Sequence, residues 1–194
     1  MAKKTCKGLT YAKYVSGGNG SPIVYSDGKV KTDYLCQVDM TEQRDSQKEY
    51  ADGHQIDSSN GLNAVQLALE LANNDPEIKK DLLGHVAGTG DNEMDVTDAD
   101  APFAGVGYIL CNRFKGVETY EGYWVHKIQF SSGGVTSKTR RENEQWEHET
   151  INGESMGVQL TSGGQVFYYA HIDLQTTEAA VRTWLNAKAG ISNP

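Results

Sequence analysis

Short apolar or alternating runs recur along most of the chain, separated by clusters of glycine, asparagine, aspartate and serine. Runs rich in Val, Ile, Tyr and Phe and bounded by turn-forming residues are typical of β-strands. The sequence predicts such strands at 9–15, 33–40, 105–111, 122–130, 157–162 and 165–174. Strands and helices do not alternate regularly, which argues against a parallel α/β fold.

The run at 122–130 shows the alternation most clearly. One face would carry Trp124, His126, Ile128 and Phe130, and the other Tyr123, Val125, Lys127 and Gln129. The second face is more polar, as expected of an antiparallel strand with one face buried and one exposed to solvent.

The stretch 62–72 fits two structures, and the residues after it decide between them. Helical spacing selects Leu62, Val65, Leu69 and Ala72, whereas strand alternation selects Val65, Leu67, Leu69 and Leu71. Asp75 is a favourable N-cap and Pro76 a favourable first residue of a helix. Glu77 would lie in its first turn, and Gly84 just past its end. Because a residue before proline is extended, one helix through both segments would break there. We therefore predict strand, turn and short helix.

A second helix is predicted near the C-terminus, with Thr176 or Thr177 as its cap and Val181, Trp184 and Leu185 on one side. The predicted fold is a mainly antiparallel β-sandwich or barrel with one short internal helix and a C-terminal helix, as a single domain over 1–194. Two polar segments, about 41–59 and 131–155, are expected to project from it as a hairpin and a long charged loop.

Charge and cysteine content narrow the function. The net charge of −8 disfavours a binder of duplex nucleic acid, which gains affinity by neutralising phosphates. No apolar run is long enough for a membrane span and none follows the N-terminal lysines as in a signal peptide, so we expect a soluble protein made in the cytoplasm. Cys6, Cys36 and Cys111 lack metal or disulfide spacing and are expected to be idle or buried thiols.

The sequence "EYADGHQIDSSNG" at 49–61 gathers a histidine, three carboxylates and two hydroxyls. Asp-Gly between extended runs favours a tight hairpin turn, since such turns need positive φ at both central positions. We therefore interpret Asp52–Gly53 as a hairpin tip flanked by Tyr50 and His54, with a further turn at 58–61, and not as an acid–base or metal site.

Other candidate sites fail on spacing. A calcium loop starting at Asp91 would need glycine sixth and glutamate twelfth, where Val96 and Pro102 stand. A looser oxygen site on Asp95, Asp98 and Asp100 stays open. "WEHET" has no second histidine at zinc-helix spacing, and "GHVAGTG" lacks the Lys–Ser/Thr ending of a phosphate loop. The sequence predicts no catalytic, metal or cofactor site.

An ordered set of motifs suggests a family. "EYADGHQIDSSNGLNAVQLALEL", "DLLGH", "DADAPFAGVGYIL" and "AAVRTWLNA" follow one another along the chain, over about residues 4 to 187. This order resembles the major tail proteins of long-tailed, non-contractile bacteriophages, particularly those of phages of Gram-positive bacteria. The chain departs from the family at 131–155, which is longer and more charged.

The resemblance implies a structural virion protein, made in the host cytoplasm, with no cofactor and no catalysis. Members of this family form hexameric rings that stack into the tail tube, and they contact other tail proteins such as the tape measure and tail terminator. DNA passes through the lumen without specific binding, and no membrane role is implied. The net negative charge is compatible with such a conduit.

Ring stacking needs an arm that reaches the next ring, and the 41–59 hairpin is our first hypothesis for it, with the charged loop second. The proposed self-association residues are Glu42, Arg44, Asp45, Lys48, Glu49, Asp52, Lys138, Arg140, Arg141 and Glu142.

Two other classes stay open. A carbohydrate-binding β-sandwich would use Tyr120, Tyr123, Trp124 and Trp146 as a sugar platform. A metal-dependent hydrolase would need His126, His148 and nearby carboxylates to converge.

Overall fold

The computed structural model describes residues 3–51, 54–72, 75–90, 93–97, 99–132 and 148–191. The protein is mainly β, with one large antiparallel sheet and two helices. In chain order the elements are β1 (Lys3–Ser16), β2 (Val24–Lys31), β3 (Leu35–Ala51), β4 (His54–Leu71), α1 (Pro76–Leu83), β5 (Val86–Ala87), β6 (Met94–Asp95), β7 (Phe103–Phe114), β8 (Val117–Ser132), β9 (Glu149–Ser155), β10 (Val158–Gln159), β11 (Val166–Phe167), β12 (Tyr169–Gln175) and α2 (Glu178–Ala189).

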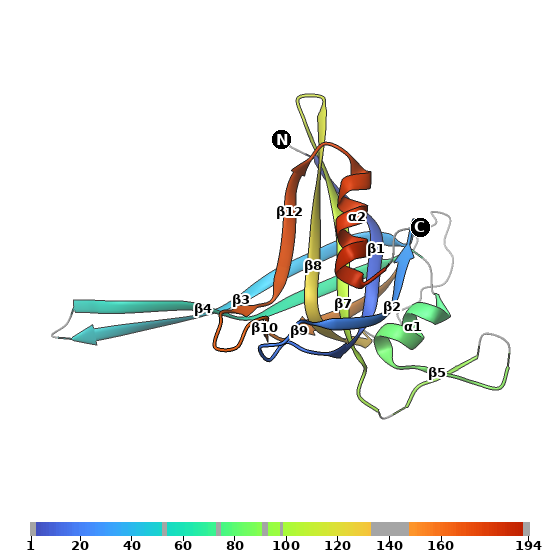
Figure 1. Ribbon diagram of the computed structural model, residues 1–194, viewed down its shortest axis with the longest axis horizontal. Coiled ribbons are helices and arrows are strands. Elements are labelled where there is room, and N and C mark those ends of the chain that lie inside the picture. The colour runs from blue at the N-terminus through green and yellow to red at the C-terminus, as the bar shows by residue number, and fades with distance from the viewer. Residues whose placement is uncertain are drawn as a thin grey trace, which may run out of the picture.

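The main sheet runs in the order β2-β1-β7-β8-β9-β4-β3, and β12 also pairs with β8. β8 is therefore forked. On its edge away from β7, residues 120–125 pair with β12 and residues 128–132 pair with β9. Figure 1 shows β12 beside the upper part of β8 and β9 near its lower part.

Because β9, β4 and β3 continue the sheet from one end of β8, the sheet curls and encloses a core, as the two layers of a sandwich do. Buried side chains from both halves of the sheet and from α1 meet there: Leu9, Tyr11, Leu67, Leu69, Ile78, Leu82, Val106, Val125, Ile128 and Ile151. The curl brings β3 into contact with β1.

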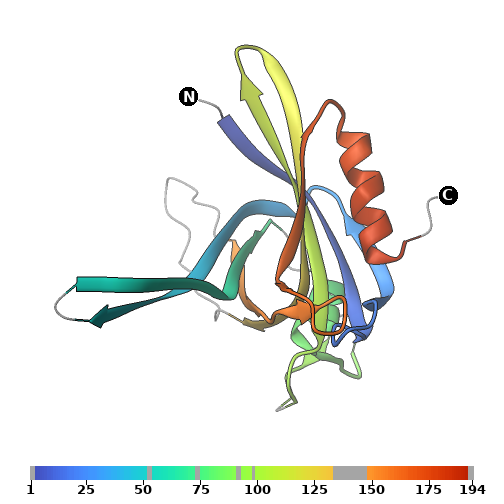
Figure 2. The ribbon, with the colours of Figure 1, turned by 60° about the vertical axis from the view of Figure 1, so that its left-hand side comes forward.

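The other face of β1, β7 and β8 is covered by α2, which lies along these strands in Figures 1 and 2. Val181 and Leu185 of α2 are buried against Trp124. A Cβ placed on Gly107 would stand 2.6 Å from Leu185 Cδ2, so glycine at this position is what allows the helix to approach the sheet.

The predicted alternation of β8 is wrong across its middle. Ile128 pairs with Ala104 and Val125 with Val106, so two residues of β8 oppose one of β7, which is a β-bulge. The bulge exchanges the faces: Trp124 faces α2, whereas Ile128 faces the core inside the curl.

Both predicted helices are confirmed, α1 with both of its ends and α2 with Thr177, one of its two predicted caps. Asp75 accepts from the Glu77 N–H at the start of α1, and Gly84 ends it with φ of 74°. Thr177 caps α2 and accepts from the Ala180 N–H. The strand interpretation of 62–71 is also confirmed.

Other boundaries differ from the prediction. No turn forms at 58–61, because these residues pair in register with 45–48 inside β4. The loop expected over 131–155 is shorter at both ends: Ser131 and Ser132 end β8, and 149–155 form β9 in the middle of the sheet. Residues 133–147 lie outside the described residues. β2 was not predicted, and the strand expected over 157–162 is reduced to β10.

Candidate self-association surface

The strands β3 and β4 extend far beyond the body of the molecule (Figure 1). β9 pairs with β4 only over 65–71, whereas the β3–β4 ladder continues from Gln43↔Ala64 outward to Ala51↔His54. We call this outer part, residues 43–64, the arm. At roughly 3.3 Å per residue, its nine positions on β3 reach about 30 Å. The predicted pairing of two strands on either side of Asp52–Gly53 is confirmed up to Ala51↔His54, and the paired strands are longer than expected; Asp52 and Gly53 themselves lie outside the described residues.

The arm is a two-stranded ribbon with polar character. Its exposed side chains include Gln43, Arg44, Asp45, Ser46 and Lys48. In the described part of the chain, β3 and β4 have no third strand along the arm, so both of its edges present unpaired backbone groups. A two-stranded hairpin by itself is marginal in water, and open edges are templates for pairing with another chain.

The root of the arm is attached to β12. The Tyr169 hydroxyl donates to Glu42 at 2.7 Å, and Arg44 donates to the same carboxylate from Nε at 2.9 Å and from Nη2 at 2.7 Å. These hydrogen bonds hold the pKa of Glu42 below its usual value, and the one from Tyr169 has the largest effect. Glu42 and Arg44 are thus paired within one chain.

The other predicted residues are placed only in part. Asp45 and Lys48 are exposed on the same strand of the arm. The backbone of Glu49 pairs with Asp57 near the tip. Asp52 lies outside the described residues, as do the members of the charged loop: Lys138, Arg140, Arg141 and Glu142.

Open strand edges also occur on the body. Within the described residues, β2 pairs only with β1, and β12 only with β8. β2 additionally exposes Val24 and Val30 on its surface. The sheet therefore ends in edges on both sides, and unlike edges of neighbouring copies could pair in a closed ring.

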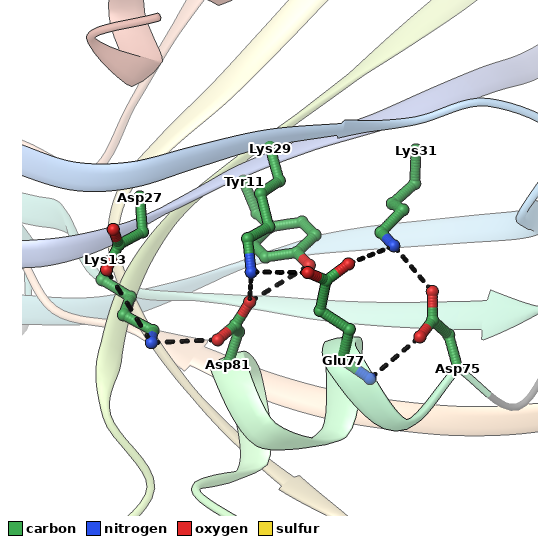
Figure 3. Close-up of polar contacts among 8 residues, drawn as sticks. All are labelled: Tyr11, Lys13, Asp27, Lys29, Lys31, Asp75, Glu77 and Asp81. Carbon is green, nitrogen blue, oxygen red and sulfur yellow. Dashed lines mark hydrogen bonds and ion pairs between the residues drawn. The ribbon is translucent and has the colours of Figure 1, made fainter. Parts of the chain in front are cut away.

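A charge cluster that sequence reasoning missed anchors α1 to the sheet (Figure 3). Asp81, whose side chain is 2% exposed, accepts from Lys13 Nζ at 2.9 Å and from Lys29 Nζ at 2.6 Å. Lys31 Nζ lies 2.7 Å from Asp75 and also contacts Glu77, which in turn lies 2.9 Å from Lys29. Three lysines from β1 and β2 thus face three carboxylates at α1.

The electrostatics of this cluster favour a structural role. Burial by itself would raise the pKa of Asp81, but the hydrogen bonds from Lys29 and Lys13 outweigh it and hold the pKa below its usual value. A carboxylate that is ionised and bound by two ammonium groups is a poor proton acceptor. The cluster is therefore a clamp that holds α1, and no signal in the sequence links the strand lysines to the distant helix.

The histidines and aromatics that could have formed a site do not converge. His126 is buried, and burial together with Lys188 lowers its pKa to about 4, so it is neutral at pH 7. Trp124 is fully buried under α2, whereas Tyr123 stacks on Tyr108 on the opposite face of β8. A sugar platform from Tyr123 and Trp124 is therefore absent, and Trp146 lies outside the described residues.

Within the described ranges, no three His, Cys, Asp or Glu side chains are grouped as a metal site would need. No helix in that part of the chain is long and apolar enough to cross a membrane. Compared with models of known protein families and with curated proteins, the sequence matches none of them.

Proposed function

We propose that the chain is a structural subunit that assembles with copies of itself into hexameric rings, which stack into the tail tube of a phage with a long, non-contractile tail. The motif order of the sequence suggests this family. In this role the protein is not an enzyme, needs no cofactor, and contacts tape measure and tail terminator proteins in the virion while DNA passes through the lumen.

The arm is the observation that carries the proposal. It reaches about 30 Å and contributes no side chain to the two core clusters, and along most of its length its edges have no backbone partner within the described residues, so that another chain could pair with them. Each exposed charge pair contributes about 1 kcal/mol or less, so repetition around a ring has to supply the strength of stacking.

The open edges of the body support ring formation. β2 on one side and β12 on another present unpaired backbone in the described sheet. An unlike-edge contact between neighbours is heterologous, and it closes into a ring when the rotation between copies fits. The arm then connects one ring with the next.

The test is a shortened arm that preserves register. Removal of 45–48 and 58–61 deletes four facing pairs, joins Arg44 to Glu49 and Asp57 to Leu62, and keeps both the faces of each strand and the tip. It shortens the arm by about 13 Å. By negative-stain microscopy, wild-type protein should form rings and tubes, and the variant folded monomers or single rings.

A control variant with an arm of full length separates the effect of arm length from the effect of its charged side chains. Asp45→Asn with Lys48→Gln keeps the full arm, and tubes should persist because each exposed charge contributes little. Long tubes from the shortened variant would exclude the arm as the stacking element. Wild-type protein that stays monomeric in sedimentation at high concentration would contradict self-assembly itself.

A further inference from the structure

The curled sheet has a seam where the first half of β1 meets the start of β3. β1 pairs with β2 only from Leu9 onward, so the edge at 3–8 is not covered by β2. In the described sheet, β3 pairs only with β4, and it contacts this part of β1 through Cys6 and Cys36. We define the seam as residues 3–8 of β1 and 35–40 of β3.

A β-bulge aims Cys6 at the seam. Lys7 pairs with Ile109 and Leu9 with Tyr108, which leaves Gly8 between them with φ of 58°. The extra residue reverses the alternation of β1. Consequently Lys7 faces α2, where it binds Glu178, and Cys6 faces the inside of the curl beside β3.

The Cys6 thiol takes the place of a ladder hydrogen bond. Its sulfur donates to the Cys36 carbonyl at 3.2 Å, and the backbone N–H of Val38 acts against the burial that raises the pKa of this thiol. A carbonyl and the N–H two residues later point to the same side of a strand, where a neighbouring strand would normally bond both. One thiol therefore closes the seam against the backbone of the other cysteine.

The three cysteines differ in exposure. Cys36 is exposed and Cys6 is half-buried, whereas Cys111 is buried on the opposite face of the sheet. We infer that Cys6 and Cys36 are a redox-sensitive dithiol, which an oxidised low-molecular-weight disulfide converts into a covalent bond between β1 and the start of β3.

The exchange follows from this difference in exposure. The Cys36 thiolate attacks one sulfur of the small disulfide, and one small thiolate leaves and takes up a proton. Cys6 then loses its proton, attacks the Cys36 sulfur of the mixed disulfide, and releases the second small thiol. Two protein thiols are oxidised and one small disulfide is reduced to two thiols. Cys36 is the first nucleophile because its side chain is exposed, whereas that of Cys6 is half-buried at the seam.

The consequence is a covalent link between β1 and the start of β3, the strand that continues into the arm. In reduced protein the thiol contact adds to the packing of Leu35, Val38 and Met40 against the core, whereas oxidising surroundings outside a cell would add a covalent bond across the seam. A bond between positions 6 and 36 also restrains the unfolded chain. This inference goes beyond the assembly proposed above and does not depend on it, because the cross-link forms within one chain.

Oxidised glutathione added to the full-length protein provides the test. Of the 3 thiols, two should disappear in an Ellman titration under denaturing conditions, and non-reducing peptide mass mapping should join the peptides of Cys6 and Cys36. The melting temperature should rise by about 5 °C or more and return on reduction. Cys111→Ser should leave the cross-link intact.

Cys36→Ser is the matched variant, because its side chain is exposed and the substitution does not disturb the core. It should lose no thiol pair to glutathione and show no melting shift. The inference is overturned if wild-type Cys36 stops at the mixed disulfide, forms only links between chains, or joins Cys111.

Discussion

Replacing Asp81 by asparagine tests whether the charge cluster clamps α1. The change keeps the shape of the side chain and removes only its charge from between Lys13 and Lys29. Their Nζ atoms lie 2.9 Å and 2.6 Å from the carboxylate in the wild type.

The expected loss follows from burial and from the partners. Breaking a buried pair by removing one member costs about 3–5 kcal/mol, mostly through the charge left behind. Here the charges that remain belong to lysines whose side chains are 33% and 31% exposed and can be solvated by water. The loss of stability is therefore expected at the lower end of this range. We expect a loss of about 3 kcal/mol, or a fall in melting temperature of about 6–12 °C for a chain of this size.

Urea unfolding at several pH values measures the effect. The folded pKa of Asp81 lies below its unfolded value, so its stabilisation is present above the unfolded pKa and is lost as pH falls through the folded one. The difference between wild type and Asp81→Asn should therefore be full at pH 7 and shrink below about pH 4.

Glu77→Gln is the matched control, because Glu77 belongs to the same cluster but is 45% exposed. It should lose only about 1 kcal/mol or less. An unfolding free energy of Asp81→Asn within about 0.5 kcal/mol of wild type at pH 7 would refute the clamp.

Two further predictions concern the second core and pH. Leu185→Ala, at a side chain 1% exposed under α2, should lose about 2–4 kcal/mol in urea unfolding, whereas exposed Thr183→Ala should change stability by about 0.5 kcal/mol or less; equal effects would contradict the packing of α2. His126, with its folded pKa of about 4, should make wild-type stability fall between about pH 6.5 and 4, because the unfolded chain takes up the proton first. Its imidazole resonance in NMR should titrate near 4, and a midpoint near 6.5 would contradict its burial.

Local chemistry in the sequence was sufficient for the helices and for the hairpin. Asp75, Pro76 and Gly84 determine where α1 begins and ends, and the Asp-Gly sequence at 52–53 predicted the pairing of the strands on either side of it, through backbone requirements that act over a few residues. The strand at 62–71 followed from alternation once proline excluded a continuous helix.

Features that depend on distant partners could not be predicted in this way. Residues 58–61 have turn-forming types, but pairing with 45–48 keeps them extended. β9 contains Gly153, a residue type that does not indicate a strand. Glycine is needed there because a Cβ would stand 2.7 Å from Ile128 and from Phe130. The partners of Asp81 come from strands far away in the sequence, and the charged-loop members of the predicted surface lie outside the described residues.

The forked, curled sheet also determines the order in which the chain can fold during synthesis. β1 pairs with β7, as in Leu9↔Tyr108, and β4 pairs with β9, as in Leu67↔Gly153, so both must wait for much later residues. The β3–β4 hairpin is local, and such hairpins close within about 1–10 μs. The two strands of the arm can therefore meet while the apolar side of β1 is still uncovered. Because the β3 run "TEQRDSQKE" at 41–49 is polar, nascent chains on one messenger share little apolar surface there, and contact between their arms is limited to open backbone edges and charged side chains.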